Sequence, residues 1–87
     1  MSSNPKITIT IKLFAAYQEA YNVAELKRDF SPNTSILEVL NQLISERPEL
    51  EKWRSLTRFG LNLHFVEAET LIQDGDEIVF IPPVSGG

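Results

Sequence analysis

The residues with the clearest chemical potential are the last two of the sequence, Gly86 and Gly87. A glycyl carboxylate on an extended segment is a chemical handle. An enzyme that activates it needs close backbone approach, which glycine permits because it has no Cβ. Pro82 and Pro83 precede the glycines by a few residues. They favour an extended backbone and cannot donate hydrogen bonds to a sheet, so they direct the residues that follow away from the sheet. A frayed chain end is the alternative interpretation of the two glycines.

Few other residues could do chemistry. The chain has one histidine, His64, and no cysteine. No carboxylate has the spacing from His64 that a metal site or a catalytic pair would need. Asp74 and Asp76 flank Gly75 in a pattern typical of a turn, where such carboxylates accept hydrogen bonds from backbone amides. The chain has no cysteine, so any sulfur it carries must sit on another group. We therefore expect no metal site, no bound cofactor and no catalytic site within the domain itself.

The apolar pattern predicts four strands and one main helix. Residues 7–13 and 77–81 are the long first and last strands, and the last is apolar on both faces, which predicts a central position in the sheet. A capping box formed by Ser35 and Glu38 begins the main helix, and Pro48 disfavours its continuation. The remaining predicted elements are a helical turn at 14–21, strands at 24–30 and 61–66, and a short second helix at 48–53.

This order of elements predicts one α+β domain in the 87-residue chain. A right-handed crossover through the helix would place the first and last strands side by side and parallel. The expected fold is a ubiquitin-like β-grasp, a mixed sheet of four to five strands with one main helix packed across one face. We expect residues 1–6 to be a flexible lead, residues 7–81 to form the β-grasp domain, and residues 82–87 to be an extended C-terminal tail.

The charge pattern bears on partners and location. The net charge is −4, and no lysine or arginine follows Arg58. Nucleic acid is therefore a poor partner, and a protein with a basic groove is a better one. Acidic residues that follow Arg58 are Glu67, Glu69, Asp74, Asp76 and Glu77.

No apolar run is long enough to span a membrane and no signal peptide is visible, so a cytoplasmic location is expected.

Segments through nearly the whole chain resemble one family, the β-grasp sulfur carriers, which include the small subunit of molybdopterin synthase and the carrier of thiazole synthesis. The ending Pro-Pro-Val-Ser-Gly-Gly is the most specific match and resembles the molybdopterin branch. One departure is the stretch 63–65, Leu-His-Phe, where the family has a more polar, turn-like sequence. The other matching segments are Ile-Lys-Leu-Phe-Ala at 11–15, the helix at 37–43, Asn62, Asp-Gly-Asp-Glu at 74–77, and Phe80 with Ile81.

The resemblance implies a mechanism centred on Gly87. An E1-like adenylating enzyme would use ATP to adenylate the Gly87 carboxylate, and a sulfur donor protein would convert it to a thiocarboxylate. The tail would then enter a larger synthase subunit, in a heterotetramer of two small and two large subunits, and pass its sulfur to cyclic pyranopterin monophosphate. Gly86 would give clearance in the partner's channel, and the residues before it would set reach and direction: Pro82, Pro83, Val84 and Ser85.

A tail of this kind needs a docking surface on the domain. Ordering a short segment costs about 1–2 kcal/mol of backbone entropy per residue, so further contacts have to hold the partner in place. We expect an exposed apolar patch that includes Phe14, Phe59 or Ile81. The alternative is that these three residues belong to the core.

Three other functions remain open from the sequence. The chain could carry sulfur for thiazole synthesis or another pathway, which the identity of its large partner would distinguish. It could be a ubiquitin-like protein modifier, whose Gly87 would end in an amide bond to a lysine. It could also be a plain β-grasp binding module, which would tolerate loss of Gly86 and Gly87.

Overall fold

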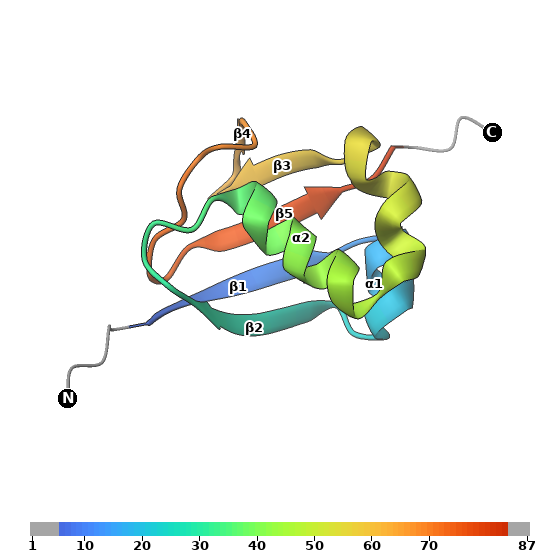
Figure 1. Cartoon of the computed structure of the whole chain (residues 1–87), viewed down its shortest axis with the longest axis horizontal. Helices are drawn as coiled ribbons and strands as arrows, with labels where there is room; N and C mark the ends of the chain where they lie inside the picture. Colours follow the sequence, from blue (N-terminus) through green and yellow to red (C-terminus); the bar gives the residue numbers. More distant parts are fainter. Residues whose placement is uncertain (1–5, 84–87) are drawn as a thin grey trace.

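Two strands from opposite ends of the chain form the centre of the sheet. In a computed structural model that describes residues 6–83, β1 (Ile7–Leu13) pairs in parallel with β5 (Glu77–Ile81). The strand order is β2-β1-β5-β3-β4, so β5 is central, as its two apolar faces predicted (Figure 1). Residues 1–5 of the predicted lead and 84–87 of the predicted tail lie outside the described residues.

The other strands complete a mixed five-stranded sheet. β2 (Glu25–Phe30) pairs antiparallel with β1, and β3 (Arg58–Leu61) pairs antiparallel with β5. β4 (His64–Val66) is antiparallel to β3 at the edge of the sheet. With the helix across one face, this is the predicted ubiquitin-like β-grasp arrangement.

The prediction of one continuous strand over residues 61–66 is wrong. Asn62 and Leu63 instead form the two-residue turn of a hairpin between β3 and β4. Both have left-handed backbone angles, with φ of 49° and 75°. Such angles are typical of a two-residue type I′ turn, which matches the twist of the flanking strands. The apolar alternation of this stretch concealed the turn.

The main helix, α2 (Ile36–Glu46), crosses one face of the sheet (Figure 1). The predicted capping box is confirmed, because the Glu38 backbone N–H donates to the Ser35 hydroxyl at 3.2 Å and the Ser35 N–H donates to the Glu38 carboxylate at 2.8 Å. One face of α2 packs on the sheet through side chains that are all buried, namely Ile36, Val39, Leu40, Leu43 and Ile44.

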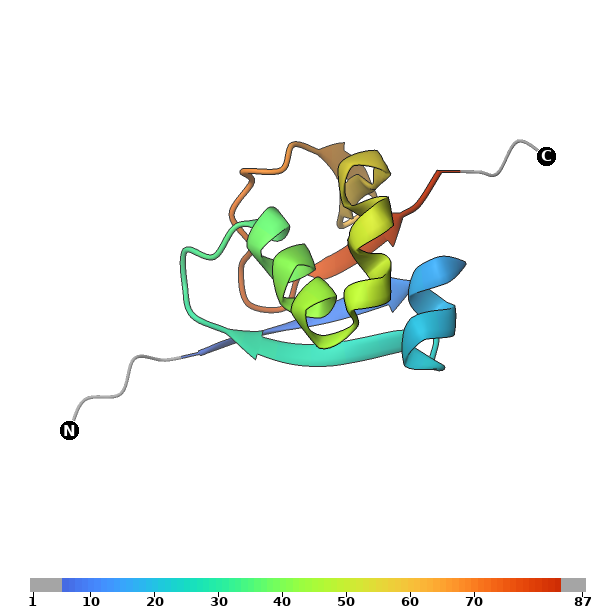
Figure 2. The ribbon, with the colours of Figure 1, turned by 45° about the vertical axis from the view of Figure 1, so that its right-hand side comes forward.

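Two short helices lie at the end of the molecule where β5 stops (Figure 2). They are α1 (Ala16–Tyr21) and the 3₁₀ helix η1 (Pro48–Leu56), near the predicted helical turn and second helix. Trp53 of η1 packs against the core, as is usual for tryptophan. None of the helices within residues 6–83 is long and apolar enough to cross a membrane.

A polar cluster ties three elements together at the edge of the core. Arg28 of β2 donates two hydrogen bonds to the Glu46 carboxylate of α2, at 2.8 and 3.0 Å, and the Tyr21 hydroxyl of α1 donates a third at 2.6 Å. The hydrogen bonds from Arg28, and then those from Tyr21 and Gln42, lower the pKa of Glu46 to about 2, although partial burial acts in the opposite direction. Burial and the bond to Glu46 raise the pKa of Tyr21.

We predict that this cluster stabilises the fold except in acid. The pKa of Glu46 is lower in the folded state than its ordinary value of 4.5, so its contribution is complete above about pH 4.5 and is lost as the pH falls towards 2. Glu46→Gln should lower the free energy of unfolding at pH 7 by about 1–3 kcal/mol, the range for hydrogen bonds to charged groups. Urea unfolding from pH 7 to pH 2 should show a weaker pH dependence for this variant.

Glu51→Gln is the matched control for this prediction. Glu51 is exposed and pairs with Arg54 within the same helix, so its loss should change stability much less. A Glu46→Gln protein as stable as the wild type at pH 7 would contradict the stabilising role of the Glu46 cluster.

Candidate functional site

The described chain ends where β5 leaves the sheet. Pro82 is buried and Pro83 is exposed. The two prolines share a hollow of about 470 Å³ with Leu56, Arg58 and Ile81. We call this hollow the tail exit. The predicted tail residues lie outside the described part of the chain: Val84, Ser85, Gly86 and Gly87.

The sheet face opposite α2 is apolar next to the tail exit. Ile78 and Phe80 of β5 are buried in the core, so Val79 and Ile81 point to the other face by strand alternation. They line a hollow of about 200 Å³ together with the β3–β4 hairpin. We call its four large apolar side chains, Leu63, Phe65, Val79 and Ile81, the apolar face. Ile81 also lines the tail exit, so the two surfaces are continuous.

Gly60 forms the floor of this hollow. It pairs with Val79 on one side and with Phe65 on the other. A Cβ at this position would lie 3.5 Å from the Val79 Cβ, which is ordinary contact. The glycine is therefore not required by close packing, and its missing side chain leaves room between Val79 and Phe65 for a group from another molecule.

Two side chains of the apolar face are strongly exposed. Leu63 is 92% exposed and Phe65 is 70% exposed. Leu63 also has a left-handed backbone, which is unfavourable for a residue with a bulky side chain. Folding gains little from a leucine at this position, because its side chain is almost fully in water. A strained and exposed apolar residue of this kind points to a binding role.

The three predicted interface residues do not share one surface. Phe14 is 50% exposed and follows Leu13, which pairs with Phe80, so Phe14 lies beside Ile81 at the tail end of the sheet. Phe59 lies on the opposite face and packs against the core, its ring 5.8 Å from that of Phe80 in an edge-to-face arrangement. The alternative of core packing thus applies to Phe59.

The exposure of Leu63 and Phe65 was not predicted from the sequence. The signal was present, because these apolar residues follow Asn62 where the related family has a polar, turn-like stretch. We interpreted them as strand residues. Alternation over six residues cannot distinguish one strand from a hairpin whose turn contains only two residues.

Asn62 holds the hairpin in place. Its side-chain amide donates to Asp76 at 2.9 Å and its side-chain oxygen accepts from the Glu77 backbone N–H at 2.9 Å. Asp76 also accepts from the Gln73 N–H, and Asp74 accepts from the Thr8 N–H. The predicted role of the two aspartates in binding backbone amides is therefore confirmed. Asn62 links the hairpin turn to this second turn.

The open sheet face is divided between polar and apolar halves. On its β1 and β2 side, Lys12 pairs with Glu25 at 2.8 Å and with Glu77 at 3.6 Å. Its hydrogen bond to Glu25 is the main cause of its raised pKa. These exposed ion pairs form a charged rim beside the apolar face. A partner that covers the apolar face therefore meets a polar rim, as is usual for protein interfaces.

Comparison with known proteins identifies the family. A sequence model of the ThiS family matches residues 11–87. The chain belongs to the ThiS family. A molybdopterin synthase sulfur carrier subunit from Arabidopsis thaliana is 31% identical over 81 residues, which cover 93% of this chain and 84% of that protein. The resemblance seen in the sequence is thus confirmed.

Two solved structures show the same fold. One is small archaeal modifier protein 1 from Methanosarcina acetivorans, with 26% identity and a TM-score of 0.74 over 95% of this chain and 99% of that one. The other is a complex of subunits 1 and 2 of molybdopterin-converting factor from Helicobacter pylori, with 26% identity and a TM-score of 0.60 over 93% of this chain and 100% of that one.

We predict that Leu63→Gly stabilises the fold. Glycine adopts left-handed angles without strain, and Asn-Gly is a favoured pair for this turn. The free energy of unfolding measured in urea should rise by about 0.5–1 kcal/mol. Leu71→Gly is the control, because Leu71 is 50% exposed but is not among the positive-φ residues, and that change should not stabilise. A less stable Leu63→Gly protein would show that Leu63 supports the fold.

Proposed function

We propose that this chain is the sulfur-carrier subunit of a molybdopterin synthase and that the Gly87 carboxylate carries the sulfur. The proposal rests on the continuous surface formed by the apolar face and the tail exit in a chain of the ThiS family. The family match extends to Gly87, and the Arabidopsis thaliana relative is named a molybdopterin synthase sulfur carrier subunit. The proposed acceptor is cyclic pyranopterin monophosphate.

The proposed chemistry fits the residues of the chain. A carboxylate has no good leaving group, and adenylation of Gly87 by an E1-like enzyme with ATP would supply one. Sulfide-level sulfur from a sulfur donor protein would then attack the carbonyl carbon of the adenylate and expel AMP. The product is a thiocarboxylate, a sulfur nucleophile in a chain that has no cysteine. Gly86 would let the activating channel close around the backbone. These steps place the catalytic groups on the partners.

The apolar face would dock the larger synthase subunit. A partner side chain that enters the hollow above Gly60 would contact Val79 and Phe65 and remove both from water. Such contacts would offset the entropy lost when the tail is ordered in the partner's pocket. The Helicobacter pylori structure contains a related small subunit in complex with subunit 2. We propose the same type of pairing here, in a heterotetramer of two small and two large subunits.

A protein-modifier function is the second candidate. It is favoured by the similarity to small archaeal modifier protein 1 from Methanosarcina acetivorans. Both functions begin with activation of a C-terminal glycine, and they differ in the bond that follows. A modifier forms an amide with a lysine of a target, whereas a sulfur carrier releases its sulfur and recovers the carboxylate. The covalent product formed at Gly87 in cells distinguishes the two.

We predict that the final glycine is essential for activity and dispensable for folding. Deletion of Gly87 should abolish sulfur transfer in an assay with the activating enzyme, the sulfur donor and the large subunit. The melting temperature should not change, because chain ends contribute little to stability. Gly86→Val should block adenylation by crowding the channel, whereas Ser85→Ala serves as a mild control. Normal adenylation of Gly86→Val would contradict the proposed role of Gly86.

We also predict that Phe65 contributes binding energy to the large subunit. Phe65→Ser should weaken the complex at least about tenfold, since burying an aromatic side chain at an interface is worth more than 1 kcal/mol. Calorimetry with the large subunit measures this effect, and circular dichroism checks the fold. Leu71→Ser, which removes an exposed leucine outside the apolar face, should bind as the wild type does. Equal affinities for Phe65→Ser and the wild type would exclude the apolar face as the docking surface.

A further inference from the structure

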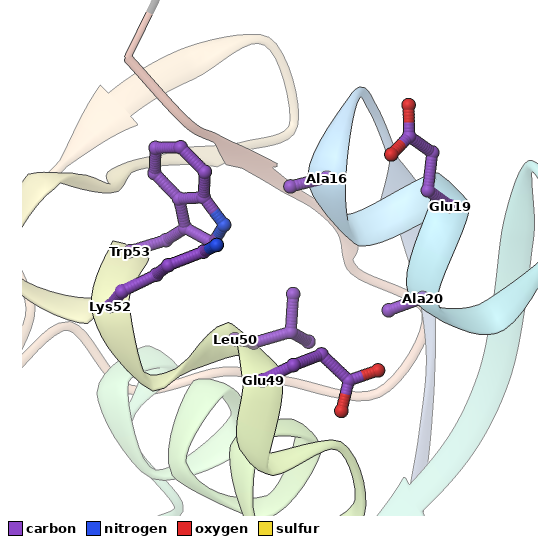
Figure 3. Close-up of a pocket in the computed structure, with 7 residues that line it drawn as sticks. All are labelled: Ala16, Glu19, Ala20, Glu49, Leu50, Lys52 and Trp53. Atoms are coloured by element: carbon purple, nitrogen blue, oxygen red, sulfur yellow. The ribbon is translucent and has the colours of Figure 1, made fainter.

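A groove between α1 and η1 lies outside the apolar face (Figure 3). It has a volume of about 280 Å³. Ala16 and Ala20 form the α1 wall, and their small side chains leave the space open. Leu50 and Trp53 of η1 lie opposite, with the Leu50 side chain directed into the space between the helices. We call this space the α1–η1 groove.

Hydrogen bonds at both ends hold the walls of the α1–η1 groove in place. At one end the Tyr17 hydroxyl bonds to Thr57, whose own hydroxyl donates to the Trp53 carbonyl at 2.8 Å. At the other end the Arg47 side chain donates from Nε to the Ala20 carbonyl at 3.1 Å. The groove is therefore formed before any partner binds, which lowers the entropic cost of binding.

The chemistry of the groove favours a cation on an apolar stem. Glu19 and Glu49 lie on its two sides, and within residues 6–83 neither carboxylate takes part in an ion pair. Leu50 and the Trp53 ring supply the apolar surface between them. The ring already has a cation over it, because the Lys52 ammonium lies 5.5 Å from its centroid. The residues that line the groove carry two carboxylates and one ammonium, and the Arg47 guanidinium lies at one end of the groove.

We propose that the α1–η1 groove binds an arginine side chain that a partner protein presents next to an apolar residue. A guanidinium can stack on the Trp53 ring while it pairs with Glu49 or Glu19. The apolar neighbour would cover the partly exposed side chains of Ala16 and Ala20. This site is independent of the Gly87 chemistry and of the apolar face. Its test therefore does not depend on the proposed function.

Trp53 provides a direct readout, because it is the only tryptophan of the chain. The probe is the blocked peptide acetyl-Leu-Arg-Leu-amide, titrated into the full chain while Trp53 fluorescence and backbone amide NMR shifts are recorded. We expect a saturable fluorescence change, with the largest amide shifts at Ala20 and Leu50. The same peptide with citrulline in place of arginine keeps the shape and loses the charge, and should bind at least about fivefold more weakly.

Variants separate the groove from general surface charge. Glu19→Gln combined with Glu49→Gln should weaken binding of the arginine peptide at least about fivefold. Glu67→Gln combined with Glu69→Gln removes the same charge from exposed positions outside the groove and should leave binding unchanged. Lys52→Ala should strengthen binding, because the competing cation leaves the ring. Equal binding of the citrulline peptide, no saturable change, or shifts centred on Val79 and Phe65 would each overturn the proposal.

Discussion

The parallel pairing of β1 with β5 is the constraint on which the rest of the structure depends. It places the last strand in the middle of the sheet, with β1 on one side and β3 on the other. Ile78 and Phe80 are thereby fixed in the core, and Val79 and Ile81 are directed to the open face. The pairing also fixes where the chain leaves the sheet, because β5 stops at Ile81 and two prolines follow. One strand therefore sets the core, the apolar face and the tail exit together.

The surface near the tail exit shows features that folding alone does not favour. Leu63 keeps a left-handed backbone and an almost fully exposed side chain, and Gly60 leaves a hollow that a side chain could fill. The Leu63 backbone lowers the stability of the fold, and the hollow at Gly60 does not improve it. Both features are useful for binding. Elsewhere the small domain is firmly connected, with the Glu46 cluster and the Asn62 link joining elements distant in sequence. Leu63, the bulkiest of the described residues with a positive φ, thus lies on the surface that we assign to a partner.

Most of the fold could be predicted from the sequence because local and global signals agree. The capping box at Ser35 and the two-faced apolar pattern of β5 each have one physical interpretation. The hairpin could not be predicted in this way, since its turn has a leucine where glycine is usual and the apolar alternation continues through it. The exposed apolar residues were only partly predicted. Phe14 and Phe59 look alike in sequence, and only the strand register shows that one is half exposed while the other packs on Phe80.

The central claim is that Gly87 carries sulfur, and the most direct test is the mass of the C-terminal peptide of this protein recovered from cells that contain its sulfur machinery. The peptide mass is needed because oxidation of Met1 adds nearly the same nominal mass to the whole chain. We expect a fraction of peptides in which sulfur replaces one carboxylate oxygen of Gly87. A Gly87 joined by an amide bond to a lysine of another protein, or one that is never modified, would contradict the account.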